Sequence, residues 1–261
     1  MSVITLRDVS IRYGEGSGSV LAVDSFNLEV EENEFLCLLG PSGCGKSTVL
    51  KAIAGLIGIQ AGETMYGPGA TRSTDRFVVW QEPTLMPWRT ILRNVTYPLE
   101  LAGLDKQTAR TSARRQLDLL GIGEFSDKYP RQLSGGMRQR AGIARALVAD
   151  PNVLLMDEPF AALDAQTRRL LQEQLLELWN GLEKTVVFVT HSVEEAILLG
   201  DRIAVMTARP GMLKEIIDVP FRRPRSPDIR HTAEYQQLEK RIWQLLHSEA
   251  EKADAEVEGQ S

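Results

Sequence analysis

The sequence predicts an α/β fold: a parallel sheet at the core, an antiparallel β-subdomain at the N-terminus and an inserted helical subdomain. Short apolar runs without alternation, at 35–39, 153–156 and 185–189, are typical of strands that helices bury on both faces. Residues 3–13 alternate apolar and polar side chains, as a half-buried antiparallel strand does. Between these groups, residues 85–150 have a mainly helical pattern, which predicts the insertion.

The N-terminal elements lead into the core. After the first strand, we expect a flexible loop over 14–19 and a second strand over 20–30. A tight turn at 31–33 then precedes the apolar strand 35–39. The segment behind the glycine-rich residues 40–48 has the apolar spacing of a helix, so this stretch predicts a strand, a loop and a helix in that order.

The middle of the chain predicts one more strand and two helices. Phe77 to Trp80 form a short apolar run that ends at Gln81. One helix carries the leucines before Gly121, which closes it, and a second runs from Met137 to Ala149. Asp150-Pro151 stops the second helix, because proline cannot continue one.

The last part of the chain resumes the alternation of strand and helix. An amphipathic helix is expected over 166–182, and strands are expected near 202–207 and 213–219. Between those strands, Arg209-Pro210-Gly211 places proline before glycine, which predicts a type II turn.

The C-terminal tail from Pro220 is rich in proline and arginine and then becomes helical. One narrow apolar stripe recurs at three- and four-residue spacing, formed by Tyr235, Leu238, Ile242, Leu245 and Leu246. We expect this stripe to dock on its own domain, with a dimer or partner contact as the alternative. Residues 249–261 are acidic and polar, and we expect them to be frayed or disordered.

Residues 40–48, GPSGCGKST, match the phosphate-loop pattern in the required strand–loop–helix context. Glycines let backbone N–H groups close around a phosphate, and the following helix adds partial positive charge. Lys46 supplies a full charge for the outer phosphates, and Ser47 supplies a hydroxyl for Mg²⁺. The sequence therefore predicts that the chain binds a nucleoside triphosphate through Gly40, Pro41, Ser42, Gly43, Cys44, Gly45, Lys46, Ser47 and Thr48.

Two adjacent carboxylates follow the apolar run 153–156. Asp157 and Glu158 would be costly at the end of a buried strand unless a cation or hydrogen-bond donors meet them. We expect Asp157 to hold Mg²⁺ and Glu158 to orient or deprotonate an attacking water.

Ser134-Gly135-Gly136 precede the helix that begins near Met137. Ser134 is an N-cap candidate, and the two glycines expose backbone N–H groups. This segment could be a second anion site by the same physics as the first, or a plain capped helix.

Composition excludes several classes of protein. The 261 residues carry 30 basic and 35 acidic side chains, a net charge of −5, so we expect no nucleic-acid partner. The two cysteines, Cys37 and Cys44, fall in the buried strand and the phosphate loop and suggest no disulfide framework. We see no signal-peptide pattern and no apolar run of about 18 residues, so a membrane process would need another chain.

At this point the chain resembles the ATP-binding subunits of ABC transporters, from Val3 to about Val219. LSGGM at 133–137 matches the signature sequence that separates this family from other phosphate-loop ATPases. The resemblance implies an ATPase domain over 1–219, with its helical subdomain at about 85–150, and a helical tail over 220–261.

The family pattern also implies roles for further residues. Tyr13 falls where the family stacks an aromatic ring on adenine, and Gln81 matches the glutamine that reaches Mg²⁺ and the attacking water. Asp164 lies in the loop that crosses the dimer, and His191 matches the histidine that contacts the γ-phosphate. ATP and Mg²⁺ would be held between two copies, by the phosphate loop of one and by Ser134, Gly135 and Gly136 of the other.

Within the family, the chain looks like the importer ATPases for nitrate, aliphatic sulfonates and taurine. The features are LMPW at 85–88, the run 157–179 and the short helical tail. The expected partners are a second copy, integral permease subunits and, indirectly, an extracytoplasmic solute-binding protein, at the cytoplasmic face of the inner membrane. ATPases for a thiamine pyrimidine precursor, exporter ATPases and, remotely, soluble ABC ATPases acting on nucleic acid or ribosomes are the alternatives.

The loop over 80–88 carries large apolar residues between prolines. Such residues outside a regular element are candidates for a partner interface. We expect Leu85, Met86 and Trp88 to line the groove that receives a permease helix, or else to pack within the helical subdomain.

Overall fold

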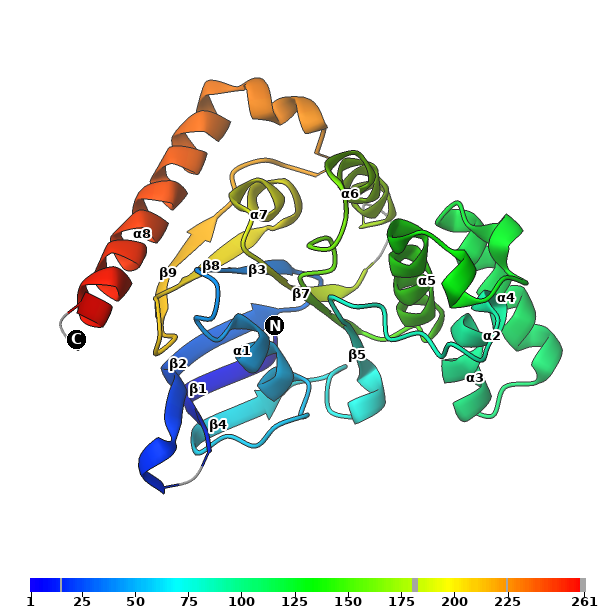
Figure 1. The fold of residues 1–261 in the computed structure, drawn as a ribbon, viewed down its shortest axis with the longest axis horizontal. Coiled ribbons are helices and arrows are strands. Elements are labelled where there is room, and N and C mark those ends of the chain that lie inside the picture. Colours follow the sequence, from blue (N-terminus) through cyan, green and yellow to red (C-terminus); the bar gives the residue numbers. More distant parts are fainter. Residues whose placement is uncertain (15, 180–182, 224, 259–261) are drawn as a thin grey trace.

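The computed structural model describes residues 1–14, 16–179, 183–223 and 225–258. A six-stranded sheet forms the centre of the molecule (Figure 1), and its first five strands are parallel while the last is antiparallel. Its strands, in spatial order, are β5 (Arg76–Val79), β6 (Val153–Asp157), β7 (Thr185–Thr190), β3 (Phe35–Leu39), β8 (Arg202–Met206) and β9 (Leu213–Asp218). The predicted parallel core is confirmed.

The predicted antiparallel subdomain is a second sheet, with β1 in its centre. Its order is β2 (Val20–Glu31), β1 (Ser2–Tyr13) and β4 (Ala61–Tyr66). Short 3-10 segments connect elements here and elsewhere: η1 (Gly16–Gly18), η2 (Ser73–Asp75), η3 (Gly123–Phe125), η4 (Pro130–Gln132) and η5 (Pro227–His231).

The central sheet has a hydrophobic core on each face, which explains the unbroken apolar runs. In β3, Leu36 and Leu38 face a core that also contains α1 (Lys46–Ile53) and the antiparallel sheet. Phe35, Cys37 and Leu39 face the other core. That core is covered by α6 (Ala165–Trp179), α7 (Val193–Leu199) and α8 (Ala233–Glu258). A strand that is buried on both sides therefore carries mostly apolar side chains, with polar residues at its ends.

The segment between β5 and β6 is helical, as predicted, and lies beside the sheet (Figure 1). It contains α2 (Ile91–Val95), α3 (Tyr97–Leu101), α4 (Lys106–Leu119) and α5 (Gly135–Val148). Asp105 caps α4 and Ser134 caps α5 through side-chain acceptors. The helix predicted over 166–182 is α6, which ends at Trp179, and residues 180–182 lie outside the described residues.

The stripe on the C-terminal helix docks on its own domain, as predicted, because Tyr235, Leu238 and Ile242 are buried in the second core. We expected fraying from Glu249, but α8 continues through Glu258. Glu249 is itself buried, and its Oε1 lies 2.6 Å from Nζ of Lys214. An ion pair with β9 therefore anchors this part of the helix. Residues 259–261 lie outside the described part of the chain.

The type II turn predicted at Arg209-Pro210-Gly211 is wrong. The Arg209–Pro210 peptide bond is cis, and Gly211 lacks the positive φ that a type II turn requires at its third residue. A Cβ on Gly211 would lie 2.1 Å from the carbonyl oxygen of Cys44. Glycine occurs here because the phosphate loop approaches closely, a reason that the local sequence does not contain.

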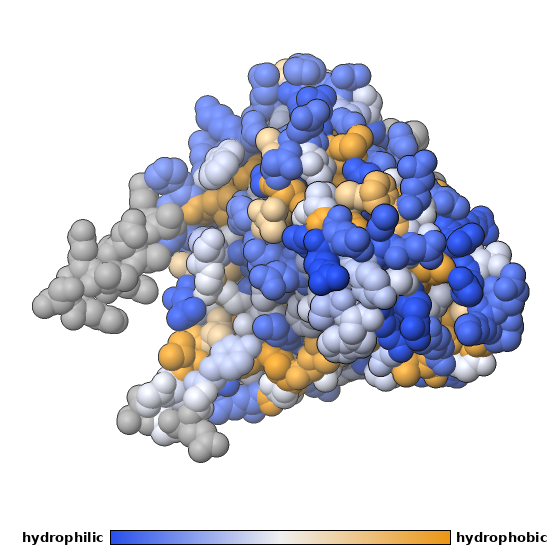
Figure 2. Space-filling model, turned by 45° about the vertical axis from the view of Figure 1, so that its right-hand side comes forward, coloured by the Kyte–Doolittle hydropathy of each residue, from blue (hydrophilic) through white to orange (hydrophobic). Residues whose placement is uncertain are grey.

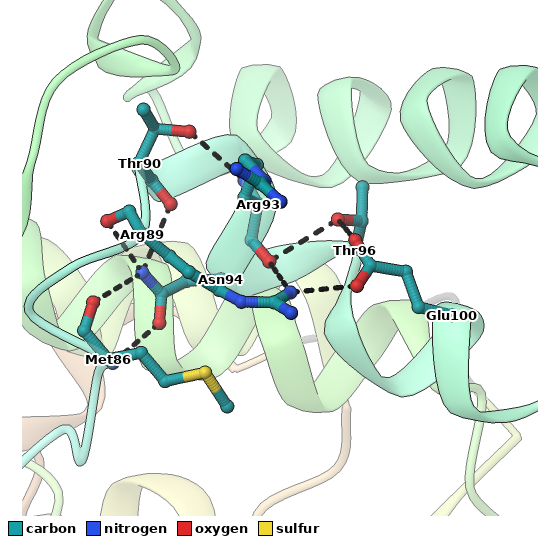
Figure 3. A network of polar contacts seen from close by, with 7 residues as sticks. All are labelled: Met86, Arg89, Thr90, Arg93, Asn94, Thr96 and Glu100. Carbon is teal, nitrogen blue, oxygen red and sulfur yellow. Dashed lines mark hydrogen bonds and ion pairs between the residues drawn. The ribbon is translucent and has the colours of Figure 1, made fainter.

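The loop before α2 is held by one buried amide (Figure 3). Asn94 is fully buried; its Oδ1 accepts from the Met86 N–H at 2.7 Å, and its Nδ2 donates to the carbonyls of Met86, Arg89 and Thr90. These bonds fix the loop that carries Trp88, and Trp88 itself is 73 % exposed.

The three apolar residues of this loop have different environments. Leu85 packs against the main core, Met86 is half-buried and only Trp88 is exposed. The half-buried Leu85 follows the alternative expectation of packing within the domain, and the groove for a permease helix stays a prediction.

Candidate nucleotide-binding site

The phosphate loop connects β3 to α1, at the carboxyl end of the central strand. Gly43 and Gly45 have φ values of 76° and 105°, which side chains other than glycine rarely adopt. The loop thereby curls around the Lys46 side chain, which is 4 % exposed. Its Nζ donates to the carbonyls of Gly40 and Pro41 at 2.9 Å each. The ammonium is thus aimed at the interior of the loop, where a phosphate would lie.

Asp157 ends β6 directly beside the start of α1. Its Oδ1 accepts a 2.7 Å hydrogen bond from Ser47 Oγ. Burial raises the pKa of Asp157, the neighbouring Glu158 carboxylate raises it further, and the Ser47 hydroxyl opposes this rise. A buried carboxylate that is costly to ionise is well suited to a cation.

Glu158 directly follows Asp157 at the end of β6. Its φ is 43°, a conformation that costs energy for a residue other than glycine and is often found at functional sites. The Glu158 N–H donates to the Val189 carbonyl of the neighbouring strand. Its Oε2 lies 2.9 Å from Nδ1 of His191, and its Oε1 lies 3.9 Å from Nζ of Lys46. Glu158 therefore joins the histidine to the lysine.

A buried network behind His191 was not predicted. Thr190 Oγ1 donates to Glu195 Oε2 at 2.5 Å, and Gln172 Nε2 donates to the other oxygen at 3.0 Å. Thr190 Oγ1 also accepts from the Ser192 N–H, so the network fixes the turn that carries His191. Burial raises the pKa of Glu195, and the hydrogen bonds from Thr190 and Gln172 oppose this rise. The pairing of α6 with α7 that creates this network has no local sequence signal.

The phosphate loop and Glu158 line one open pocket of about 290 Å³, and Asp157 and His191 lie next to it through their contacts with Ser47 and Glu158. The phosphate loop forms its floor with Glu158 at one wall, and Tyr13 lines the rim, where its hydroxyl donates to Thr48 Oγ1 at 3.3 Å. Sequence reasoning missed three of the lining residues: Val20, Ala22 and Arg209.

Other predicted site residues lie away from this pocket. Ser134 caps α5, where its Oγ accepts from the Met137 N–H, and both Ser134 and Gly135 are exposed. Gly136 is buried because this cap packs against the start of α6, and a Cβ there would lie 2.4 Å from Thr167 Cγ2. Asp164 lies in the same region, and a hydrogen bond from the backbone of Thr167 lowers its pKa.

Gln81, exposed in the bend after β5, also does not line the pocket. One copy of the chain therefore brings together the phosphate loop, Asp157, Glu158, His191 and Tyr13, but not Gln81, Asp164 or Ser134 to Gly136.

The site suits Mg²⁺ as a companion of a nucleotide. Among the described residues, no cluster of three or more His, Cys, Asp or Glu side chains has the arrangement of a metal cage. Mg²⁺ usually needs only one or two protein ligands because substrate phosphates and waters supply the rest. The Ser47 hydroxyl and the buried Asp157 carboxylate, in contact with each other, fit that requirement.

A glycine-rich loop between a central parallel strand and a helix, with its lysine and two carboxylates, defines a phosphate-loop nucleotide hydrolase. The ABC transporter family model matches residues 23–161, and the chain belongs to this family as an ATP-binding, ATP-hydrolysing transport subunit. The resemblance identified from the signature sequence is thus confirmed.

Three relatives illustrate the similarity. An uncharacterised ABC transporter ATP-binding protein of Methanocaldococcus jannaschii is 51% identical over 240 residues, covering 90% of this chain and 87% of the relative. The taurine import ATP-binding protein TauB of Rhizobium johnstonii is 42% identical, covering 91% and 92%. The nitrate import ATP-binding protein NrtD of Synechocystis is 43% identical and covers 77% of each.

The fold agrees with a solved relative. A dimeric ATP-binding cassette bound to ADP and Pi, in a post-hydrolysis state, matches 84% of this chain and 100% of its own. The TM-score is 0.73 and the sequence identity 31%. Every helix within the described residues is too short or too polar to span a bilayer.

Proposed function

We propose that this ATPase powers the import of a small anionic solute, such as nitrate, an aliphatic sulfonate or taurine, through a separate permease. The taurine import and nitrate import functions for which two relatives are named support this substrate class. The solute would be selected by an extracytoplasmic binding protein. The ATPase would act at the cytoplasmic face of the inner membrane.

The observation that carries the catalytic part of the proposal is that Lys46 and Glu158 line one pocket, with Asp157 hydrogen-bonded to its lining residue Ser47. Lys46 and the loop amides bind the phosphates of ATP, and Tyr13 stacks on adenine. Ser47 and Asp157 would hold Mg²⁺, which would offset negative charge on the phosphates when bound. Phosphoryl transfer depends mainly on such positioning and charge stabilisation.

Glu158 orients the attacking water and accepts its proton. The water oxygen forms a bond to the γ-phosphorus while the bond to the β,γ-bridging oxygen breaks, and ADP leaves with that oxygen. His191 contacts the γ-phosphate and, through its 2.9 Å contact, keeps the Glu158 carboxylate in place. Loss of ATP hydrolysis with retained ATP binding in Glu158→Gln tests this assignment.

A second copy completes the site. Ser134, Gly135 and Gly136 begin α5 as an exposed helix N-terminus with a side-chain cap, and such a terminus binds anions. Because this cap lies outside the pocket of its own chain, we infer that it contacts the nucleotide of a partner, with Asp164 beside it. The dimeric state of the solved cassette with ADP and Pi supports this arrangement.

The permease contacts the helical subdomain. An open pocket of about 660 Å³ lies between α2, α3 and α4. Its lining carries both charges and apolar groups, including Arg93, Glu100, Leu104, Lys106 and Arg110. Trp88 and Leu101 are exposed on the same subdomain.

Hydrophobic residues on this side of the molecule form small separate groups (Figure 2). A partner helix with mixed polarity therefore fits better than a wholly apolar one. A Trp88→Ala protein that hydrolyses ATP but no longer co-purifies with its permease would support the contact, and unchanged association would exclude Trp88 from it.

A further inference from the structure

The turn between β8 and β9 lies directly against the phosphate loop. The Gly211 N–H donates to the Ala22 carbonyl at 2.9 Å, and the Asp24 N–H donates to the Gly211 carbonyl at 3.1 Å. Close packing of Gly211 on Cys44 leaves no room for a Cβ. The turn is thereby joined to the wall and floor of the nucleotide pocket.

Arg209 extends from this turn to the pocket. Its Nη2 donates to the Gly43 carbonyl at 3.2 Å, and the residue lines the pocket together with Lys46 and Glu158. That contact uses one of the five N–H donors of a guanidinium. A pocket with two cations and one carboxylate favours a polyanion, and the planar guanidinium fits phosphate oxygens well.

The C-terminal helix holds the turn from the other side. In Figure 1 the far part of α8 runs beside β9 toward this turn. Glu249 is 3 % exposed, and its Oε2 accepts from the Ala208 N–H at 3.3 Å. Its Oε1 lies 2.6 Å from Lys214 Nζ, which also donates to Ser248 Oγ and the Leu245 carbonyl. One carboxylate thus ties the helix to the residue next to Arg209.

We propose that Arg209 binds the phosphates of the nucleotide and that Glu249 is a positioning residue, through which the end of α8 sets nucleotide affinity. The proposal rests on the proposed nucleotide site. It adds a contact from outside the phosphate loop and a role for the C-terminal helix, neither of which follows from the sequence motifs.

The test compares Arg209→Gln, Glu249→Gln and the double variant with the full-length wild-type protein. Titration with Mg·ATP gives Kd, and steady-state hydrolysis gives KM and kcat. We expect Arg209→Gln to weaken binding about three- to tenfold, as for a partly exposed charged contact, with KM raised and kcat within about twofold. Glu249→Gln should weaken binding in the same direction, and Glu234→Gln, in the exposed first turn of the same helix, should not.

The double variant distinguishes positioning from a general structural effect. If Glu249 acts through Arg209, its replacement has no further effect on Kd once Arg209 is glutamine, even if thermal unfolding shows a less stable helix. An equal effect of Glu249→Gln in both backgrounds would overturn the positioning role. Wild-type affinity in Arg209→Gln would overturn the proposal as a whole, whereas failure of the wild-type protein to bind Mg·ATP would overturn the nucleotide site itself.

Discussion

Glu158 Oε2 lies 2.9 Å from His191 Nδ1, across the ends of two neighbouring strands. The other carboxylate oxygen lies 3.9 Å from the Lys46 ammonium. Glu158 therefore lies between the histidine and the ammonium that faces the phosphates.

Glu158→Gln should slow ATP hydrolysis by about a hundredfold or more, because loss of a general base typically has an effect of this size. Binding of Mg·ATP should persist, since the phosphate loop and Lys46 are unchanged. Single-turnover hydrolysis and equilibrium binding measure the two effects. Glu173→Gln, which alters an exposed pair with Arg169 on α6, serves as the control, and near-wild-type turnover by Glu158→Gln would remove this residue from the role.

Lys46→Ala should weaken Mg·ATP binding by about ten- to a hundredfold, the effect expected when a charge-assisted hydrogen bond is lost. The loss falls on binding and not on the chemical step alone, because this ammonium faces the phosphates in the ground state. Isothermal titration measures the change. Lys128→Ala, an exposed lysine of the helical subdomain, should bind as the wild type does; unchanged affinity in Lys46→Ala would contradict the assignment.

Asp157→Asn should stabilise the nucleotide-free protein at pH 7.5 and weaken its Mg²⁺-dependent binding of ATP, because a carboxylate ligand is lost. Burial raises the pKa of Asp157 in the folded protein above its value in the unfolded chain. The protonated carboxyl therefore contributes stability that is fully present below the unfolded pKa and is lost as pH rises through the folded pKa. Asparagine avoids that loss and can keep the bond from Ser47. We expect Tm to rise by about 2 °C.

The pH dependence provides the control for this variant. The gain in Tm should shrink as pH falls toward the ordinary range of an aspartate, because the wild-type carboxyl is then protonated as well. Mg·ATP should raise Tm of the wild-type protein more than that of Asp157→Asn. A gain that does not depend on pH would show that the charge of Asp157 is not its cause.

Asn94→Ala should destabilise the helical subdomain by about 2–4 kcal/mol, because several buried backbone groups lose their partner at once. Urea unfolding measures the loss, and hydrogen exchange should show it first in the loop over 85–90. Asn27→Ala, which removes exposed hydrogen bonds on β2, should cost much less. Equal effects of the two substitutions would contradict the anchoring role of Asn94.

Much of the fold could be predicted because its signals are local. Unbroken apolar runs identified the parallel strands, and the loop from Gly40 to Thr48 identified the floor of the site. Residues brought in by sheet order escaped prediction. Arg209 and Gly211 reach the phosphate loop only because β8 lies beside β3, and Glu195 meets Gln172 only because α7 packs on α6. For Leu85 the sequence left a partner groove and packing within the domain open, because a local pattern does not tell which loop residue contacts the core.

The head-to-tail dimer is tested most directly by mixing two inactive variants. Lys46→Ala lacks the phosphate-loop half of each site, and Ser134→Arg blocks the signature half. Each variant alone should have little activity, whereas an equimolar mixture should recover about a quarter of the wild-type rate, because half of the dimers then contain one intact composite site. Full activity of Ser134→Arg alone, or no recovery on mixing, would contradict a nucleotide site shared between two copies.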